Sequence, residues 1–149
     1  MIKSLTVIIL SLAPISELRG AIPTGIALGF SPIQIFLISV FFNAIAFFPI
    51  YFGLKYFYKY VKNNNFITRI VERARKRGHK PMEKYGVWGL ILFVAIPLPF
   101  TGVWTATIIS WLFNVEWWKS FAVIATGVII AGIIVTLSSI GAIQFLQVI

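Results

Sequence analysis

The chain has 149 residues, of which 59% are hydrophobic and 11% are charged. A soluble domain usually carries about 25% charged residues, so this composition excludes an ordinary soluble domain and predicts an integral membrane protein. Cysteine and aspartate are absent and histidine occurs once, which excludes disulfides and thiolate metal sites and argues against a hydrolase or a metalloenzyme. We therefore expect no enzyme activity, no bound metal and no cofactor.

The formal net charge of +9 is concentrated in one part of the chain. Residues 55–84 contain ten Lys or Arg and two Glu, a balance of +8. Basic loops between membrane segments lie on the cytoplasmic side, where they also meet anionic lipids. The pattern therefore predicts a cytoplasmic connector that contacts an anionic leaflet, and it does not favour a nucleic-acid partner.

The first apolar segments are short. As a helix, residues 2–13 would extend roughly 18 Å, whereas the hydrocarbon core of a membrane is about 30 Å thick. Gly20–Phe30 is shorter still and contains Pro23. We expect these two arms to form a re-entrant hairpin, which enters and leaves the membrane on one side. Ile33–Leu54 follows and is long enough to cross the membrane completely.

The second half of the chain repeats this order. Tyr85–Ile96 is a short apolar arm, and Pro97 and Pro99 interrupt it because proline lacks a backbone donor and clashes with the preceding turn. Gly102–Phe113 is the second arm, and Phe121–Ile140 is long enough to span the membrane. Paired interrupted segments in two halves indicate a transporter with its site near the bilayer midplane. Six ordinary kinked helices are the alternative.

The sequence thus predicts an all-α integral membrane protein built from two inverted repeats, each a re-entrant helical hairpin plus a full transmembrane helix. Residues 1–54 form the first repeat, residues 55–84 a basic amphipathic cytoplasmic connector, and residues 85–149 the second repeat, within a single membrane domain. Because the connector is cytoplasmic, the first hairpin enters from outside and the second from the cytoplasm, and both termini lie outside.

The connector contains a predicted amphipathic helix. Its apolar side is formed by Phe66, Ile67, Ile70, Val71 and Ala74. Its basic side is formed by Arg69, Arg73, Lys76 and Arg77. Gly78 and Pro81 are expected to end the helix, because glycine and proline commonly follow helix C-termini. A helix with this pattern lies on the membrane surface, so we expect the four basic residues to contact the cytoplasmic leaflet.

Glu17 and Arg19 are the main candidate functional residues, because they lie at the tip of the first hairpin. Ionisable residues inside a membrane are costly and by default mark a functional site. Arg19 presents a planar fork of donors that suits phosphate or carboxylate, and a helix starting near Pro23 would direct its positive end at the same ligand. Glu17 is expected to carry a proton or to neutralise Arg19. The alternative is a structural role for the two residues, as a buried ion pair.

The second hairpin tip adds further candidates. Thr101 and Thr105 offer hydroxyl groups near the break, and Trp104 lies between them, so these side chains could bind a head group or satisfy the interrupted backbone. Asn43 lies at the middle of the first full span, where a polar amide should face the hairpins rather than lipid. The predicted substrate- or proton-binding residues are Glu17, Arg19, Pro23, Asn43, Pro97, Pro99, Thr101, Trp104 and Thr105.

Two motifs resemble those of a prokaryotic family, the putative small multidrug export proteins. These motifs are Glu17-Leu18-Arg19-Gly20-Ala21-Ile22-Pro23 and Pro97-Leu98-Pro99-Phe100-Thr101-Gly102-Val103-Trp104-Thr105. That family in turn is similar to the DedA proteins, whose facing re-entrant hairpins are linked to moving polyprenyl phosphate or phospholipid across membranes. The resemblance implies a multi-pass protein of a prokaryotic plasma or inner membrane, with Glu17 and Arg19 at the acidic and basic positions of the first hairpin. DedA proteins also carry an arginine in the second hairpin, and residues 86–113 contain none.

We therefore predict a small membrane transporter that moves an anionic or amphipathic lipid-like substrate through a site between the two hairpins. Its partners would be membrane lipids and a lipid phosphate or amphipathic substrate, and so small a membrane core is consistent with a homodimer. Two alternatives stay open. One is proton-coupled export of drugs with Glu17 as the proton carrier, and the other is a non-transporting membrane factor whose basic helix docks a partner.

Overall fold

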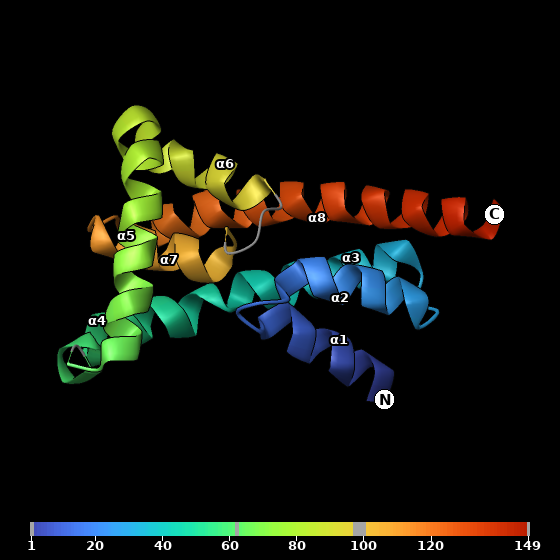
Figure 1. Ribbon diagram of the computed structural model, residues 1–149, viewed down its shortest axis with the longest axis horizontal. Helices are drawn as coiled ribbons and strands as arrows, with labels where there is room; N and C mark the ends of the chain where they lie inside the picture. The colour runs from blue at the N-terminus through green and yellow to red at the C-terminus, as the bar shows by residue number, and fades with distance from the viewer. Residues whose placement is uncertain (1, 62, 97–100, 149) are drawn as a thin grey trace.

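The computed structural model describes residues 2–61, 63–96 and 101–148, which form helices and no strand. The elements are α1 (Ile2–Leu12), α2 (Glu17–Ala27), α3 (Pro32–Ile45), α4 (Phe47–Val61), α5 (Asn65–Tyr85), the 3-10 helix η1 (Gly86–Trp88), α6 (Gly89–Ala95), α7 (Val103–Leu112) and α8 (Trp117–Val148). Most helices run along one long axis, whereas α5 lies across one end (Figure 1). The beginning of α1 and the end of α8 both lie toward the opposite end.

Helices α1 and α2 form an antiparallel pair that packs on α3. The predicted start of a helix near Pro23 is wrong, because α2 begins at Glu17 and contains Pro23. A proline inside a helix removes one backbone hydrogen bond. Leu18, Ala21 and Ile22 of the same helix are each at most 2% exposed, and this packing stabilises α2 in spite of the proline.

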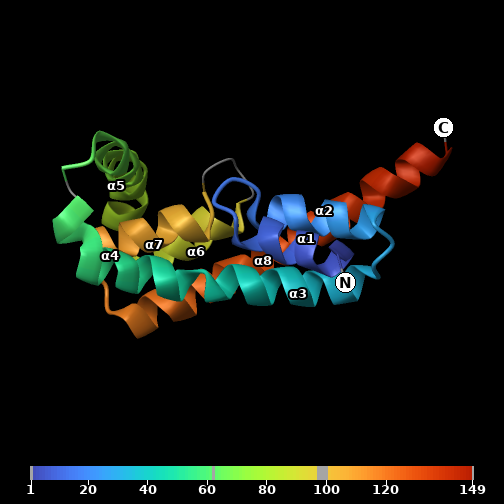
Figure 2. The ribbon, with the colours of Figure 1, turned by 90° about the horizontal axis from the view of Figure 1, so that it is seen from below.

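The predicted span Ile33–Leu54 is divided into α3 and α4, with the break at Ala46. Pro49 explains the break, because it has no amide hydrogen to donate to the Ile45 carbonyl and its ring clashes with that carbonyl. The two helices nevertheless continue in nearly the same direction (Figure 2). The α3–α4 segment therefore still extends along most of the molecule.

Helix α8 has 32 residues and is the longest helix in the described chain. The predicted span Phe121–Ile140 is too short at both ends, because the helix begins at Trp117 and continues through Gly141. Glycine ends a helix when it adopts a positive φ, and Gly141 does not. Pro32–Tyr60 and Trp117–Phe145, of 29 residues each, are the two described stretches long and apolar enough to cross a membrane. They support the predicted membrane protein.

Helix α5 has 21 residues and begins after Asn64, whose side chain caps its first turn. The predicted end at Gly78 and Pro81 is wrong, because both residues lie inside the helix. A Cβ at Gly78 would overlap Ile109 of α7, so the glycine lets α5 and α7 approach closely. The helix ends instead at Gly86, which has a positive φ of 57°.

The predicted faces of α5 have different surroundings. Val71, Ala74 and Gly78 are buried, and α5 packs on α6 and α7. Part of the predicted apolar side therefore contacts protein rather than lipid, while Phe66 and Ile70 remain exposed. The predicted basic side is exposed, and it consists of Arg69, Arg73, Lys76 and Arg77.

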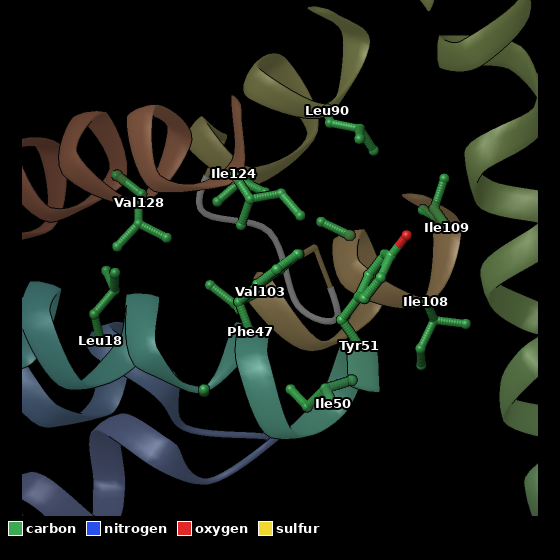
Figure 3. Packing of buried hydrophobic residues seen from close by; sticks show 14 of the residues in the cluster. Leu18, Phe47, Ile50, Tyr51, Leu90, Val103, Ile108, Ile109, Ile124 and Val128 are labelled. Atoms are coloured by element: carbon green, nitrogen blue, oxygen red, sulfur yellow. The ribbon is translucent and has the colours of Figure 1, made fainter. Parts of the chain in front are cut away.

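Among the described residues, one hydrophobic core connects both halves of the chain (Figure 3). The rings of Phe47 and Tyr51 on α4 stack with their centroids 5.2 Å apart. Phe48 lies beside Phe121 of α8, with a centroid distance of 4.8 Å. Other buried side chains in Figure 3 are Leu18, Leu90, Val103, Ile124 and Val128. The α3–α4 segment and α8 thus form the frame on which α1, α2, α6 and α7 pack.

Replacing Gly78 with valine is expected to loosen α5 from α7. The added side chain would overlap Ile109, and overpacking of this kind costs roughly 1–3 kcal/mol. Gly53→Val is the matched control, because a Cβ at Gly53 has no neighbour within 4 Å. Thermal unfolding in detergent should show a lower midpoint for Gly78→Val than for the control. Equal midpoints would contradict the close contact between α5 and α7.

Candidate functional site

Two interruptions of the helical chain meet in the middle of the molecule. The turn between α1 and α2 faces the end of α6 and the beginning of α7 (Figure 2). Hydrogen bonds at this meeting point join residues that are 77 to 92 positions apart in the sequence. Side chains of the first helical pair, α1 and α2, therefore contact the second helical pair, α6 and α7.

Arg19 binds the end of α6 and the residues before α7. Its Nη2 donates to the Thr101 hydroxyl at 3.0 Å, to the Thr101 carbonyl at 3.2 Å and to the Ile96 carbonyl at 3.5 Å. The Thr101 hydroxyl in turn donates to the Ile96 carbonyl at 2.9 Å. Helix C-termini leave carbonyls unpaired and attract cations. Arg19 therefore caps α6, although its own side chain is only partly buried.

Glu17 occupies the complementary position at the start of α7. Its carboxylate accepts a hydrogen bond from the backbone amide of Trp104 at 3.4 Å, and the residue is 6% exposed. A Cβ at Gly102 would overlap this carboxylate, so the missing side chain makes room for it. Gly102 precedes α7 and offers no side-chain cap. Glu17 therefore caps α7 from another helix, at an end where negative charge is favourable.

The backbone of Glu17 is unusual. Its φ of 44° lies in the left-handed region, which costs of order 1–2 kcal/mol for a residue with a Cβ and persists where the surroundings determine it. Within the described residues, no ion pair joins Glu17 to Arg19. Each residue instead binds backbone groups of the α6–α7 pair. The alternative prediction, an ion pair between Glu17 and Arg19 within the first hairpin, is therefore not what the structure contains.

The end of α1 is capped by three side chains from three parts of the chain. The donor and acceptor pairs are Ser16 Oγ to the Leu10 carbonyl at 2.7 Å, Asn43 Nδ2 to the Ser11 carbonyl at 2.8 Å, and Trp104 Nε1 to the Leu12 carbonyl at 3.0 Å. A helix end leaves such carbonyls unpaired, and in apolar surroundings an unpaired carbonyl is costly. Asn43 and Trp104 therefore hold the interrupted backbone of the first helical pair, and Trp104 also contacts Glu17.

An apolar cavity of about 290 Å³ lies beside this meeting point. Its lining residues are Leu12, Ala46, Pro49, Ile50 and Trp104. They come from the end of α1, the break between α3 and α4, and the first turn of α7. Three interruptions of the helical chain therefore border one apolar space. Trp104 lines this space, and its backbone amide binds Glu17.

The remaining predicted residues lie elsewhere. Pro23 lies within α2, so the helix N-terminus predicted at that position is absent. Thr105 is partly buried on α7 and makes no side-chain hydrogen bond to another described residue. Pro97 and Pro99 lie outside the described residues. The predicted membrane-surface residues lie on α5, at one end of the molecule (Figure 1), and they are Arg69, Arg73, Lys76 and Arg77.

Ile96 and Gly102 are among the contributors to the site that sequence reasoning missed. Ile96 contributes only its carbonyl, which no side-chain pattern reveals. Gly102 could have been found from its position directly after a proline-rich break, because a glycine there often allows another group to approach the backbone closely. Within residues 2–61, 63–96 and 101–148, no group of three His or Glu side chains could hold a metal ion.

Comparison with protein families gives one match. Residues 17–134 match the family described as Putative small multi-drug export protein, and this segment includes both tips. The match confirms the predicted resemblance to that family, whereas a link to the DedA proteins stays a hypothesis. Comparisons with curated proteins and with solved structures found no match for the chain.

Proposed function

The chain belongs to the Putative small multi-drug export protein family, and on this premise we propose that it moves an anionic or amphipathic lipid-like substrate between its two helical hairpins. An export protein is a membrane transporter, which moves its substrate without changing it. The family description therefore supports transport and does not suggest an enzyme. The charge of the substrate is inferred from the residues at the tips.

The exposure of Arg19 carries this proposal. Glu17 is 6% exposed, and its carboxylate faces the backbone amide of Trp104. Arg19 is only partly buried, and its hydrogen bonds to other described residues all come from Nη2. Within those residues, Nε and Nη1 have no acceptor. A guanidinium binds phosphate or carboxylate through two parallel donors, so the accessible charge at the tips suits an anion.

The apolar cavity beside Trp104 supports an amphipathic substrate. Its volume of about 290 Å³ is lined by aliphatic and aromatic side chains together with Pro49. Such a lining favours an alkyl or isoprenoid group over a polar one. A substrate with an anionic head and an apolar tail would bind Arg19 through its head and the apolar cavity through its tail.

We further propose that α1–α2 and α6–α7 are re-entrant hairpins from opposite membrane faces, related as inverted repeats. Helices α1, α6 and α7 have 11, 7 and 10 residues. At about 1.5 Å per residue, none of them can cross a hydrocarbon core about 30 Å thick. Interrupted helices at membrane depth are stable where their free backbone groups are satisfied by protein, and the caps on α1, α6 and α7 support this arrangement.

Cysteine labelling tests this arrangement, because the chain has no cysteine of its own. With the basic connector in the cytoplasm, a cysteine at Asn64 should react only from the cytoplasmic side. A cysteine at Gln144, near the end of α8, should react only from the outside. Both positions are exposed. Reaction of both cysteines from one side would overturn the inverted arrangement.

The burial of Glu17 favours a second function, the proton-coupled export of cationic drugs. A carboxylate that is 6% exposed inside a membrane is a suitable proton carrier. Protonation would remove the negative charge that caps α7 and would weaken the contact between the tips. The two functions differ in the charge of the substrate and in which tip residue is essential.

Transport in liposomes distinguishes these functions. One set receives a fluorescent polyprenyl or phospholipid phosphate, and the other receives a lipophilic cationic dye with an imposed proton gradient. We expect movement of the lipid phosphate, its loss in Arg19→Ala, and a reduced rate in Glu17→Gln, because glutamine still accepts a hydrogen bond from the Trp104 amide. Dye efflux that follows the proton gradient and fails in Glu17→Gln, without lipid movement, would establish drug export instead. If neither the lipid phosphate nor the dye moves, the result would favour a non-transporting membrane factor.

A further inference from the structure

A cleft of about 400 Å³ lies where α4 meets the turn between α7 and α8. Its lining includes Lys55 of α4, Glu116 in the turn, and the tryptophans Trp111, Trp117 and Trp118. The α7–α8 turn lies near the end of the molecule that α5 crosses (Figure 1). The cleft shares no lining residue with the apolar cavity at the tips, so it is a separate feature.

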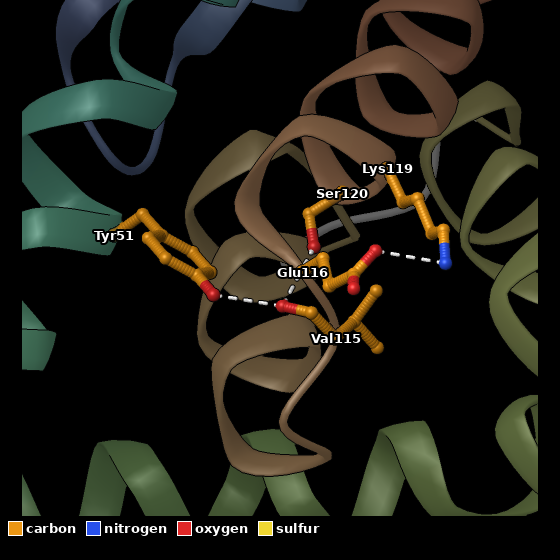
Figure 4. A network of polar contacts seen from close by, with 5 residues as sticks. All are labelled: Tyr51, Val115, Glu116, Lys119 and Ser120. Carbon is orange, nitrogen blue, oxygen red and sulfur yellow. Dashed lines mark hydrogen bonds and ion pairs between the residues drawn. The ribbon is translucent and has the colours of Figure 1, made fainter.

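Hydrogen bonds hold the α7–α8 turn against α4 (Figure 4). The Tyr51 hydroxyl donates to the Val115 carbonyl at 2.7 Å, and the Ser120 hydroxyl donates to the same carbonyl at 3.5 Å. Asn114 turns the chain with a φ of 53°, a conformation that asparagine tolerates better than most residues. The walls of the cleft are therefore fixed by the protein before any ligand binds.

The charge on the cleft wall is positive. Glu116 forms an ion pair with Lys119 at 2.8 Å, so its carboxylate is already neutralised (Figure 4). Lys55 is exposed and has no acidic partner among the residues that the structure describes. An ammonium group without an acidic partner on a concave surface favours an anionic ligand.

The cleft also presents hydrogen-bond donors. Asn114, Trp111, Trp117 and Trp118 line it, and each has a side-chain N–H group. Within the described part of the chain, neither the side-chain amide of Asn114 nor the indole N–H of Trp111, Trp117 or Trp118 has an acceptor. The indole N–H of Trp104, by contrast, is bound to a carbonyl. Several donors, together with one ammonium group that forms no ion pair with a described residue, suit a ligand rich in acceptor oxygens, such as a phosphate.

The position of the cleft points to a lipid as the source of that phosphate. Trp117 and Trp118 are 46% and 54% exposed at the start of α8, and tryptophan gathers at the membrane–water interface. Helix α5, with seven Lys or Arg, lies near the same end and favours an anionic leaflet. We propose that this cleft binds the phosphate head group of an anionic glycerophospholipid, with Lys55 as its charge partner. This site is independent of the transported substrate.

Native mass spectrometry of the full chain in a non-ionic detergent tests the site. The probes are phosphatidylglycerol and phosphatidylcholine with identical acyl chains. We expect the protein to retain phosphatidylglycerol in preference to phosphatidylcholine. Lys55→Gln should bind phosphatidylglycerol about tenfold more weakly, the loss expected for one charge-assisted hydrogen bond at an exposed position.

Lys84→Gln is the matched control, because it makes the same charge change on α5 and Lys84 does not line the cleft. It should retain the lipid as the unmodified protein does. Equal retention of the two lipids by the unmodified protein would overturn the proposal, as would equal losses in Lys55→Gln and Lys84→Gln. Displacement of the lipid by inorganic phosphate at constant ionic strength would assign the cleft to a free anion and would also overturn it.

Discussion

Replacing Arg19 with alanine is expected to reduce transport of a lipid phosphate by roughly 10- to 100-fold, because hydrogen bonds to a charged group contribute about 1.5–3 kcal/mol. The change also removes the donor that binds the carbonyls of Ile96 and Thr101. A buried polar group left unpaired costs roughly 1–3 kcal/mol. Transport rates in liposomes should therefore be measured together with thermal unfolding in detergent, which separates loss of function from loss of stability.

Arg19→Lys keeps the positive charge but lacks the planar fork, so it should restore stability more fully than transport. Arg75→Ala is the matched control, because Arg75 is exposed on α5 and distant in sequence from both tips. It should leave both quantities unchanged. Normal transport by Arg19→Ala with a lowered unfolding midpoint would mean that Arg19 only caps α6, and the proposed substrate site would then be wrong.

Replacing Gly102 with alanine is expected to lower both transport and stability, although it adds one methyl group. The new Cβ would overlap the Glu17 carboxylate, and overpacking costs roughly 1–3 kcal/mol, enough to reduce a rate about tenfold. The φ of −106° at Gly102 is accessible to alanine. A loss would therefore report the contact with Glu17 rather than backbone strain.

Gly53→Ala provides the control for this change, since a Cβ at Gly53 has no neighbour within 4 Å. It should be neutral or slightly stabilising, because alanine favours a helix over glycine. A double-mutant cycle identifies the cause. In a Glu17→Ala background, Gly102→Ala should have a much smaller effect, because the overlapping atoms are gone. An effect of unchanged size there would show that Glu17 is not the residue displaced.

Two short helices follow directly from local sequence. Residues 2–13 and Gly102–Phe113 were predicted as apolar arms, and they correspond to α1 and α7 within one residue at each end. Such bounds are predictable because interruptions require glycine, proline or polar residues at particular positions. Pro49 is a signal of the same kind, and it divides the predicted span Ile33–Leu54 into α3 and α4.

The ends of other helices were predicted wrongly because glycine has more than one structural use. Gly78 was expected to end the connector helix, but it lies inside α5 against Ile109. Gly86 ends that helix, with a φ of 57°. Whether a glycine ends a helix or makes room for a neighbour depends on what packs against it. That information is absent from the local sequence.

The sequence by itself determined that this apolar chain carries an acidic and a basic residue at its first interruption, and that a second interruption follows near residue 100. Only the tertiary structure decided what those charges contact. Arg19 binds carbonyls at the end of α6, and Glu17 binds the Trp104 amide at the start of α7. Nearly every residue has the same backbone amide and carbonyl, so no sequence pattern marks these groups as partners. They bind the charged side chains because two distant helix ends, each with unpaired backbone groups, meet in the fold.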